Sequence, residues 1–313
     1  MSLRNINQAP VAVIVGATSK WQSDGRNTKM AHGKEIDDSH IPIGIRWGVG
    51  GALAQKFAQE GFFTVLTTRK ESNATSLETA ISNQGGACMI VELDLASEES
   101  VRSAFTQIRT QAGDPDVLIY NAGYLEGRDL PADKELLEYI EVEMFDTAHH
   151  IASRGPFLVA KEVLPAMREK GEGSFFFSNN SKSLRGTKRY TGESLYYPRV
   201  MMRTLSQVLT EEYSEHGIHV ANIVIDGLID SPGTRALPKA QINPDAIINP
   251  IKIGLSHLLI TAKDTYGNKK NIVIKLEVIE KSPIIFPNPS SEKISILFQN
   301  MENTHVDIKL YKI

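Results

Sequence analysis

Cysteine is nearly absent from this sequence, and long apolar segments are absent altogether. Cys88 is the only cysteine, which excludes an internal disulfide and a cysteine metal cluster, so we expect no metal site. It lies in the apolar stretch Ala87–Val91, where we expect a buried structural thiol in a reducing compartment. No window approaches about 18 uninterrupted apolar residues, and Met1–Pro10 lacks the apolar core of a signal peptide. We therefore expect a cytoplasmic protein that spans no membrane.

The sequence also lacks a strong charge of either sign, because its net charge is only -3. Hydrophobic residues make up 41% of it and charged residues 23%, which is typical of an ordinary folded protein and excludes the collagen-like and disordered classes. A nucleic-acid-binding surface would require an excess of lysine and arginine. The expected partner is a small molecule, with no nucleic acid and no membrane.

Short apolar runs alternate with helix-period stretches along most of the chain. The runs that we expect to be strands are Val11–Val15, Phe62–Thr68, Ala87–Val91, Val117–Tyr120, Ser174–Ser178 and His219–Ile225. The stretches that we expect to be helices are Ala52–Gln59, Glu98–Gln111, Phe157–Lys170 and Val200–Glu215. Strands that alternate with helices predict βαβ units, and therefore an α/β fold with a doubly wound parallel sheet.

Two segments interrupt this alternation. Residues 22–46 carry mixed charges without sustained periodicity, and we expect an inserted loop there. The composition changes near Pro244–Pro250, so we expect a first domain at 1–248 and a β-rich C-terminal extension at 249–313. Within the extension, apolar and polar residues alternate on both sides of Gly267-Asn268, which predicts a β-hairpin that starts at His257.

The end of the extension predicts a small β module. Phe286–Ile296 and Val306–Tyr311 weakly resemble the start of the C-terminal sorting domains of Bacteroidetes-type secreted proteins, which an Ig-like hairpin precedes. Export would conflict with the missing signal peptide. A β extension, or a product of gene fusion or of gene-model error, is the favoured alternative.

A dinucleotide site needs a buried strand, a glycine turn that lets the backbone approach the pyrophosphate, and a helix whose N-terminal N–H groups face the anion. Gly16 directly follows the first strand, and Gly48-Val49-Gly50-Gly51 precedes the helical stretch from Ala52. Deleting residues 22–47 would leave the continuous turn GATSKWGVGGALA. The residues expected to bind the pyrophosphate are Gly16, Thr18, Ser19, Gly48, Val49 and Gly50.

Three further features agree with a dinucleotide site. They are Asn121-Ala122-Gly123 after the strand that ends at Tyr120, Asp94-Leu95 after the strand that ends near Val91, and Val220–Gly227 after a helix that ends at His216-Gly217. Together with the glycine turn, these residues resemble the short-chain dehydrogenase/reductase family over about Ala12–Asp245, apart from the insertion. The resemblance implies a three-layered, Rossmann-like fold for the first domain.

The resemblance also implies how a cofactor would bind. The turn Asn121–Gly123 would border the nicotinamide ribose, and Asp94 and Leu95 would lie at the adenine. The second strand ends in Thr67-Thr68-Arg69-Lys70, without the acidic residue that accepts hydrogen bonds from the ribose of NAD. Arg69 can instead pair with a 2'-phosphate, so NADP(H) is favoured over NAD(H). The alternative is that Arg69 and Lys70 are an ordinary surface pair.

The catalytic set that the resemblance implies is not preserved. Family members use Asn, Ser, Tyr and Lys, and counting from Gly155, Gly173 and Gly217 puts Ala152, Asn180, Leu195 and Arg199 at these positions. Leucine has no proton to donate, so general-acid catalysis by the family residue is impossible. Arg199 can hold ribose hydroxyls but stays protonated and cannot relay a proton as lysine does.

Nearby residues are candidates to replace the missing acid, namely Tyr190, Tyr196, Tyr197, Ser178 and Ser181. In a helix that has begun by residue 195, Tyr196 is turned by about 100° from Leu195, and Tyr197 is placed still worse. Pro198 fits only the first turn of a helix, so we expect the helix to begin near Tyr197 along a path that differs from the family's. This leaves Arg199, Asn180 and Tyr197 as the catalytic candidates. Asp226 and Ser231 lie where the family contacts the nicotinamide, and Asp226 either orients substrate or caps the turn before Gly227.

Three hypotheses follow. The first is an NADP(H)-dependent oxidoreductase of a small carbonyl or alcohol, with a remodelled proton donor. The second is a non-catalytic NAD(P)-binding pseudo-enzyme or sensor, and the third is a chimeric or disabled scaffold. The phosphate turn survives the insertion if Ser19 and Gly48 remain adjacent. By analogy with the family, Phe157–Arg168 would form the interface of a homodimer or homotetramer.

Overall fold

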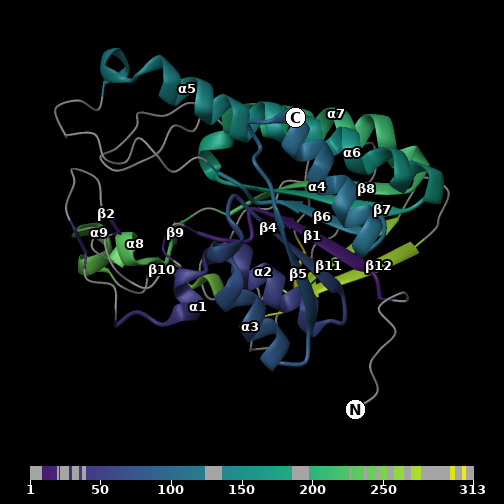
Figure 1. The fold of residues 1–313 in the computed structure, drawn as a ribbon, viewed down its shortest axis with the longest axis horizontal. Coiled ribbons are helices and arrows are strands. Elements are labelled where there is room, and N and C mark those ends of the chain that lie inside the picture. Colours follow the sequence, from purple (N-terminus) through teal and green to yellow (C-terminus); the bar gives the residue numbers. More distant parts are fainter. Residues whose placement is uncertain are drawn as a thin grey trace.

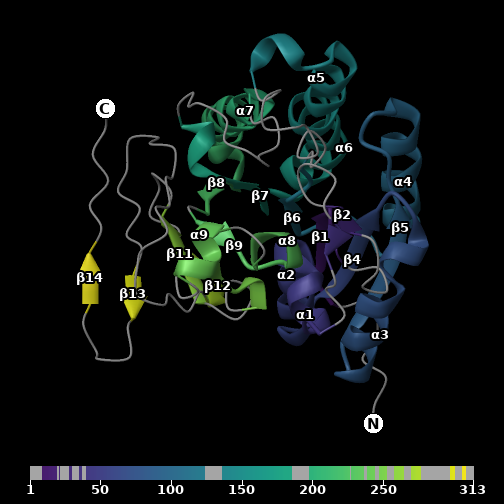
Figure 2. The same ribbon diagram turned by 90° about the vertical axis from the view of Figure 1, so that its left-hand side faces the viewer.

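The computed structural model describes the chain in separate stretches, which are residues 9–19, 21, 28–29, 35–36, 40–123, 136–184, 197–225, 227–235, 238–243, 247–251, 257–263, 269–275, 297–299 and 305–307. Its main sheet has the strand order β5-β4-β1-β6-β7-β8, which Figure 2 shows across the molecule, and neighbouring strands are parallel. These strands are β1 (Val11–Val15), β4 (Phe63–Thr68), β5 (Ala87–Glu92), β6 (Val117–Tyr120), β7 (Gly173–Asn179) and β8 (Ile218–Val224). The predicted doubly wound parallel sheet is confirmed.

Helices cover both faces of this sheet (Figure 1). The helices α2 (Gly48–Gln59) and α3 (Thr75–Asn83) lie on one face, and α4 (Glu98–Gln111), α6 (Gly155–Lys170) and α7 (Tyr197–Tyr213) lie on the other. Successive residues of a strand point to opposite faces. Val11, Val13 and Val15 therefore pack against the second group, and Ala12 and Ile14 pack against the first. This two-sided burial explains why β1 is apolar throughout.

The edge strand β5 departs from expectation. Its first four residues are only partly covered or exposed, because only one neighbouring strand pairs with it and α3 covers it incompletely. Cys88 is accordingly half-buried rather than fully buried as predicted. Burial still raises the pKa of its thiol to about 11, with a smaller contribution from the charge of Glu78. The thiol is therefore protonated at neutral pH.

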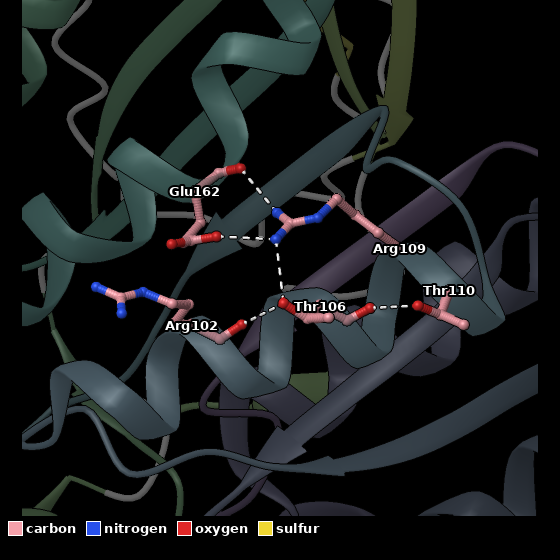
Figure 3. A network of polar contacts seen from close by, with 5 residues as sticks. All are labelled: Arg102, Thr106, Arg109, Thr110 and Glu162. Atoms are coloured by element: carbon pink, nitrogen blue, oxygen red, sulfur yellow. Dashed lines mark hydrogen bonds and ion pairs between the residues drawn. The ribbon is translucent and has the colours of Figure 1, made fainter.

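The helices α4 and α6 are joined by a polar network centred on one arginine (Figure 3). Arg109 donates to the backbone carbonyl of Glu162 at 3.2 Å and to its carboxylate at 3.1 Å. Its guanidinium also reaches Thr106, whose hydroxyl donates to the Arg102 carbonyl. This network fixes the relative position of α4 and α6 on one face of the sheet.

Shorter elements connect and extend the main sheet. They are α1 (Ile43–Arg46), α5 (Val142–His149), a π-helical turn (His150–Arg154) between α5 and α6, α8 (Pro232–Arg235), α9 (Pro238–Ile242), and the parallel pair β9 (Leu228–Ile229) and β10 (Ile247–Ile248). The helix α2 begins at Gly48, earlier than the predicted start at Ala52, and α7 begins at Tyr197 as expected from Pro198. Sequence periodicity missed α3 and α5, which are short.

The insertion and the C-terminal extension contain local antiparallel pairs. In the insertion, β2 (Thr28–Lys29) pairs with β3 (Glu35–Ile36), and its last four residues form α1 instead of a loop. In the extension, β11 (His257–Lys263) pairs with β12 (Lys269–Lys275), which confirms the predicted hairpin. A further pair joins β13 (Leu297–Gln299) and β14 (His305–Asp307), whereas Phe286–Ile296 lies outside the described stretches. No helix in the described part of the chain is long and apolar enough to cross a membrane.

Candidate functional site

The candidate site lies at the carboxyl ends of β1 and β6. These strands are neighbours, but the chain continues from β1 to β4 in one direction across the sheet and from β6 to β7 in the other. In an open α/β sheet such a reversal leaves a crevice where ligands bind. Gly16 follows β1 and Asn121 follows β6, so the fold brings these two predicted site residues together. The Asn121 side-chain amide donates to the Gly16 carbonyl at 2.9 Å.

Glycines allow main-chain segments to approach one another closely at this switch point. A Cβ on Gly50 would lie 2.8 Å from Asn121 Nδ2 and closer still to the Gly16 carbonyl oxygen. A Cβ on Gly16 would lie 2.7 Å from the Cα of Ala122, and the positive φ of Gly16 also favours glycine. Gly16, Gly50, Asn121 and Ala122 therefore form one close-packed set, which we call the glycine cradle.

The two ends of the insertion meet beside the glycine cradle. The Ser19 hydroxyl donates to the Arg46 carbonyl at 2.5 Å and accepts from the Trp21 N–H at 3.1 Å. Arg46 Nε donates to the Trp21 carbonyl at 2.7 Å. A Cβ on Gly48 would lie 3.3 Å from Ser19 Cβ, so Ser19 and Gly48 are adjacent. This is the condition set above for the phosphate turn to survive the insertion.

Trp47 packs against the N-terminal turn of α2. The indole N–H donates to the Ser76 hydroxyl at 3.0 Å, and a Cβ on Gly51 would collide with the Trp47 Cβ. The first turn of α2 contains no acidic side chain. Such a turn presents N–H groups and the positive end of the helix dipole, which together favour an anion.

The second strand of the site, β4, ends beside the glycine turn. The hydroxyls of Thr18 and Thr68 are 3.0 Å apart, and Thr67 Oγ1 accepts from the Gly16 N–H at 3.2 Å. Arg69 and Lys70 follow directly and are exposed. Two exposed cations therefore follow β4, and the Glu92 carboxylate at the end of the neighbouring strand β5 accepts from the Glu71 N–H at 2.8 Å.

Asp94 and Leu95 follow β5 as the sequence predicts. One Asp94 carboxylate oxygen accepts from the Ala96 N–H at 3.0 Å, and the Asp94 N–H donates to the Ser100 hydroxyl. The residue is exposed, and these bonds fix it as a turn before α4. Leu95 is buried, and its Cβ would lie 3.3 Å from a Cβ on Gly155.

Arg199 reaches the same edge of the sheet from the first turn of α7. Its Nη1 donates to the Ser178 carbonyl at 3.2 Å, and its Cζ lies 3.3 Å from the position that a Cβ on Gly123 would occupy. The guanidinium thus lies against the Asn121–Gly123 turn. Sequence analysis placed Arg199 and this turn in one site, and the structure brings them together.

Asn180 follows β7 and caps a short helical turn. Its side-chain oxygen accepts from the Lys182 N–H at 3.1 Å. The neighbouring Asn179, which sequence analysis did not select, is buried and bonds three groups at once. The only sequence signal for it is its place directly after the predicted strand and directly before the position that the resemblance equates with the family serine.

Ala152 lies buried in the π-helical turn, where the family has asparagine. The fully buried Tyr120 hydroxyl donates to the Ile151 carbonyl of this turn. Burial raises the pKa of Tyr120 well above its usual value, and the nearby charge of Arg199 opposes this only in part. Ser153 Oγ donates to the Pro198 carbonyl at 3.2 Å. Tyr120 and Ser153, both missed by the sequence analysis, therefore tie this turn to β6 and α7.

The remaining candidates are only partly described. Leu195, Tyr190, Tyr196 and Asp226 lie outside the described stretches, and of Tyr197 only its place at the start of α7 is described. Ser231 accepts from the Thr234 N–H at 3.1 Å and caps α8. Asp230 forms a bidentate pair with Arg235, at 2.7 and 2.8 Å, which raises the pKa of the arginine.

Comparisons with known proteins agree with this geometry. The family model described as enoyl-(acyl carrier protein) reductase matches residues 44–253. An uncharacterised oxidoreductase of Bacillus subtilis is 30% identical over 201 residues, which cover 64% of this chain and 70% of that protein. A short-chain type dehydrogenase/reductase from Mycobacterium marinum superimposes with a TM-score of 0.61 at 17% identity, over 78% of this chain and 85% of that one. A gluconate 5-dehydrogenase from Burkholderia cenocepacia, solved with NADP and tartrate, gives 0.57 at 19% identity, over 78% and 84% of the two chains.

Proposed function

The chain belongs to the short-chain dehydrogenase/reductase family, and from this premise we propose that it is an NADP(H)-dependent oxidoreductase of a small carbonyl or alcohol substrate. The observation that carries the proposal is the glycine cradle, because Gly16 and Gly50 still pack closely against Ala122 and Asn121 at the switch point although 25 residues are inserted between Trp21 and Trp47. A chain that had lost cofactor binding would have no need of these close contacts.

The residues at the crevice fit a dinucleotide. The cradle admits the close approach of a pyrophosphate, and the first turn of α2 offers N–H groups to it. Asn121, Ala122, Gly123 and Arg199 would hold the nicotinamide ribose, and Asp94 and Leu95 would hold the adenine. A bound nicotinamide supplies or accepts the hydride, and the protein supplies the binding, the orientation and the proton.

The end of β4 supports NADP(H) over NAD(H). Thr67 and Thr68 are engaged with the glycine turn, and the next two residues, Arg69 and Lys70, are exposed cations. A 2'-phosphate can accept a bidentate pair of hydrogen bonds from Arg69. The NADP complex of the Burkholderia cenocepacia relative agrees with this preference.

The proton chemistry differs from that of the family's usual set. Arg199 remains charged at any working pH, so in this proposal it binds ribose hydroxyls and holds a fixed positive charge beside the reacting carbonyl. Asn180 takes the place of the family serine, and its amide can orient the substrate oxygen. We assign the proton donor to Tyr197, because Pro198 starts α7 at this residue instead of continuing a helix from Leu195.

Titration calorimetry with NADPH and, separately, with NADH tests the cofactor proposal. We expect micromolar NADPH binding and weaker NADH binding. Arg69→Ala should remove most of this difference, and the matched control Lys70→Ala should change it less, because only Arg69 presents a planar fork. Absence of heat with either cofactor, in a chain that unfolds cooperatively, would overturn the proposal in favour of a disabled scaffold.

The alternative function is cofactor binding without hydride transfer, and Leu195 at the tyrosine position favours it. Two variants separate the alternatives in a screen of small carbonyl substrates. Turnover that is lost in Tyr197→Phe, with NADPH affinity unchanged, supports the oxidoreductase. Turnover that appears only in Leu195→Tyr supports a non-catalytic natural protein whose site lacks nothing but the acid.

We also propose that the chain forms homodimers through α6 and α7. These helices pack side by side and expose the apolar side chains Phe157, Val200, Met201 and Val208. Apolar side chains that gather on one helical face mark an association surface. Separately, we retain as a proposal the predicted division of the chain into a domain at 1–248 and a β-rich extension at 249–313.

A further inference from the structure

The buried side-chain amide of Asn179 joins three parts of the fold. They are the end of β7, which precedes Asn180, the first turn of α7, which carries Arg199, and the edge strand β8. Asn179 is 3% exposed. Its Nδ2 donates to the backbone carbonyl of Arg199 at 3.2 Å and to Asn222 Oδ1 at 3.0 Å, and its Oδ1 accepts from the Asn180 N–H at 3.0 Å. A single side chain therefore links the end of β7, the first turn of α7 and β8.

The main chain dictates which way this amide points. The Asn180 N–H can only donate and the Arg199 carbonyl can only accept, so Asn179 must turn its oxygen toward the first and its nitrogen toward the second. Asn222 then presents its oxygen to Asn179, and its own Nδ2 has no hydrogen-bond partner among the described residues. The two main-chain groups therefore set the orientation of the Asn179 amide, and the orientation of Asn222 follows from it.

Asn179 fixes the base of the Arg199 side chain, and Ser178 fixes its tip. The guanidinium donates to the Ser178 carbonyl at 3.2 Å, one residue before Asn179 in the same strand. An arginine side chain has many rotamers. When both of its ends are already held in the free protein, the guanidinium stays in one place and less conformational entropy is lost when the cofactor binds. In this structure that place is against Gly123, on the Asn121–Gly123 turn.

We propose that Asn179 is a positioning residue, which holds the first turn of α7 so that the Arg199 guanidinium lies against the Asn121–Gly123 turn. The inference rests on the proposed function, because it gives Arg199 a role in binding the cofactor. Asn179 does not touch the cofactor itself. Its contribution to cofactor affinity passes through Arg199 and disappears when Arg199 is removed.

A double-mutant cycle on NADPH affinity tests this coupling. Asn179→Ala should weaken NADPH binding about tenfold, as expected for the loss of one well-placed hydrogen bond. In an Arg199→Ala background the same substitution should weaken binding by less than about twofold. Asn179→Ser, which leaves a smaller cavity, should behave as Asn179→Ala if the alanine variant does not fold.

A matched control comes from the same helix. Thr210 is buried and donates to the Ser206 and Val220 carbonyls, so it also joins α7 to β8, but it lies about three turns from Arg199. Thr210→Val should lower stability and leave NADPH affinity unchanged. The inference is overturned if Asn179→Ala weakens NADPH binding equally in both backgrounds or in neither, or if Arg199→Ala binds NADPH as the wild type does. In each of these cases, NADPH binding by the wild type still supports the cofactor proposal. A wild-type chain that binds no NADPH would overturn both proposals.

Discussion

Gly50→Ala is the substitution for which the structure gives the sharpest expectation. The added Cβ would lie 2.8 Å from Asn121 Nδ2 and 3.0 Å from the Ala17 carbonyl carbon, and it would collide with the Gly16 carbonyl oxygen. These neighbouring groups are fixed by their own contacts and cannot move away from the added Cβ. The Gly16 N–H is bonded to Thr67 Oγ1, the Ala17 N–H is bonded to the Thr67 carbonyl, and Gly16 already abuts Ala122. The displacement must therefore fall on the first turn of α2.

The two energetic effects of this substitution oppose each other. Overpacking against fixed main chain costs about 1–3 kcal/mol. Replacing glycine by alanine stabilises a helix by at most about 1 kcal/mol, and by less in the first turn. We expect the free energy of unfolding to fall by about 1–2 kcal/mol, which the chain survives. NADPH binding should be lost, because the displaced first turn of α2 no longer presents its N–H groups where the pyrophosphate would bind.

Calorimetric NADPH titration and urea unfolding of the same preparations measure both effects. The matched control is Gly173→Ala at the start of β7, where the added Cβ would lie 2.5 Å from Met167 Cγ and Sδ. This site is equally crowded, but its neighbour is a flexible thioether, and it lies at the opposite end of the sheet from the crevice. The control should lose stability and keep NADPH affinity. A folded Gly50→Ala chain that binds NADPH as the wild type does would refute the assignment of the glycine cradle.

Two further predictions concern stability and assembly. Burial lowers the pKa of His219 from 6.5 to about 4, so between these values the unfolded chain binds more protons, and stability should fall by about 2 kcal/mol from pH 7 to about pH 5. Urea unfolding should show this fall in stability in the wild type and a smaller fall in His219→Leu. Equal falls in the two proteins would contradict the assignment of the effect to His219. Phe157 is 51% exposed on α6, and Phe157→Glu should convert dimers to monomers in light scattering. Ile242→Glu, at an exposed residue of α9, is its control, and a monomeric wild type would contradict the interface.

The sheet could be predicted because its strands are buried on both faces. A strand such as β1, with helices on each side, has to be apolar at every position, and such runs stand out in a sequence. The same reasoning failed at β5, where the apolar run Ala87–Val91 suggested full burial although the strand lies at an edge. Strand order depends on contacts between distant segments, so no local pattern separates an edge strand from a central one.

The site could be predicted where a backbone constraint leaves a mark on the sequence. Gly16 and Gly50 are such marks, because a Cβ on Gly16 would collide with Ala122 and a Cβ on Gly50 with the Gly16 carbonyl oxygen and Asn121. Asn179 and Tyr120 left no mark, because their partners are main-chain groups of α7 and of the π-helical turn. Any sequence could supply those carbonyls, so only the folded chain shows which side chains reach them.

The insertion illustrates how a long excursion can leave a tight turn intact. Closing a loop of this length in place of a short turn costs only about 1–2 kcal/mol of chain entropy. Ile41 and Ile45 within it are buried, and burial of such side chains contributes about 1.5–3 kcal/mol each, which offsets that cost. The Arg46 carbonyl then holds Ser19 in place beside Gly48, and Gly44 packs against Ile251. The insertion has therefore become part of the structure that supports the phosphate turn, and excising it would not simply restore the short turn of the family, because the Arg46 carbonyl that accepts from Ser19 would be removed with it.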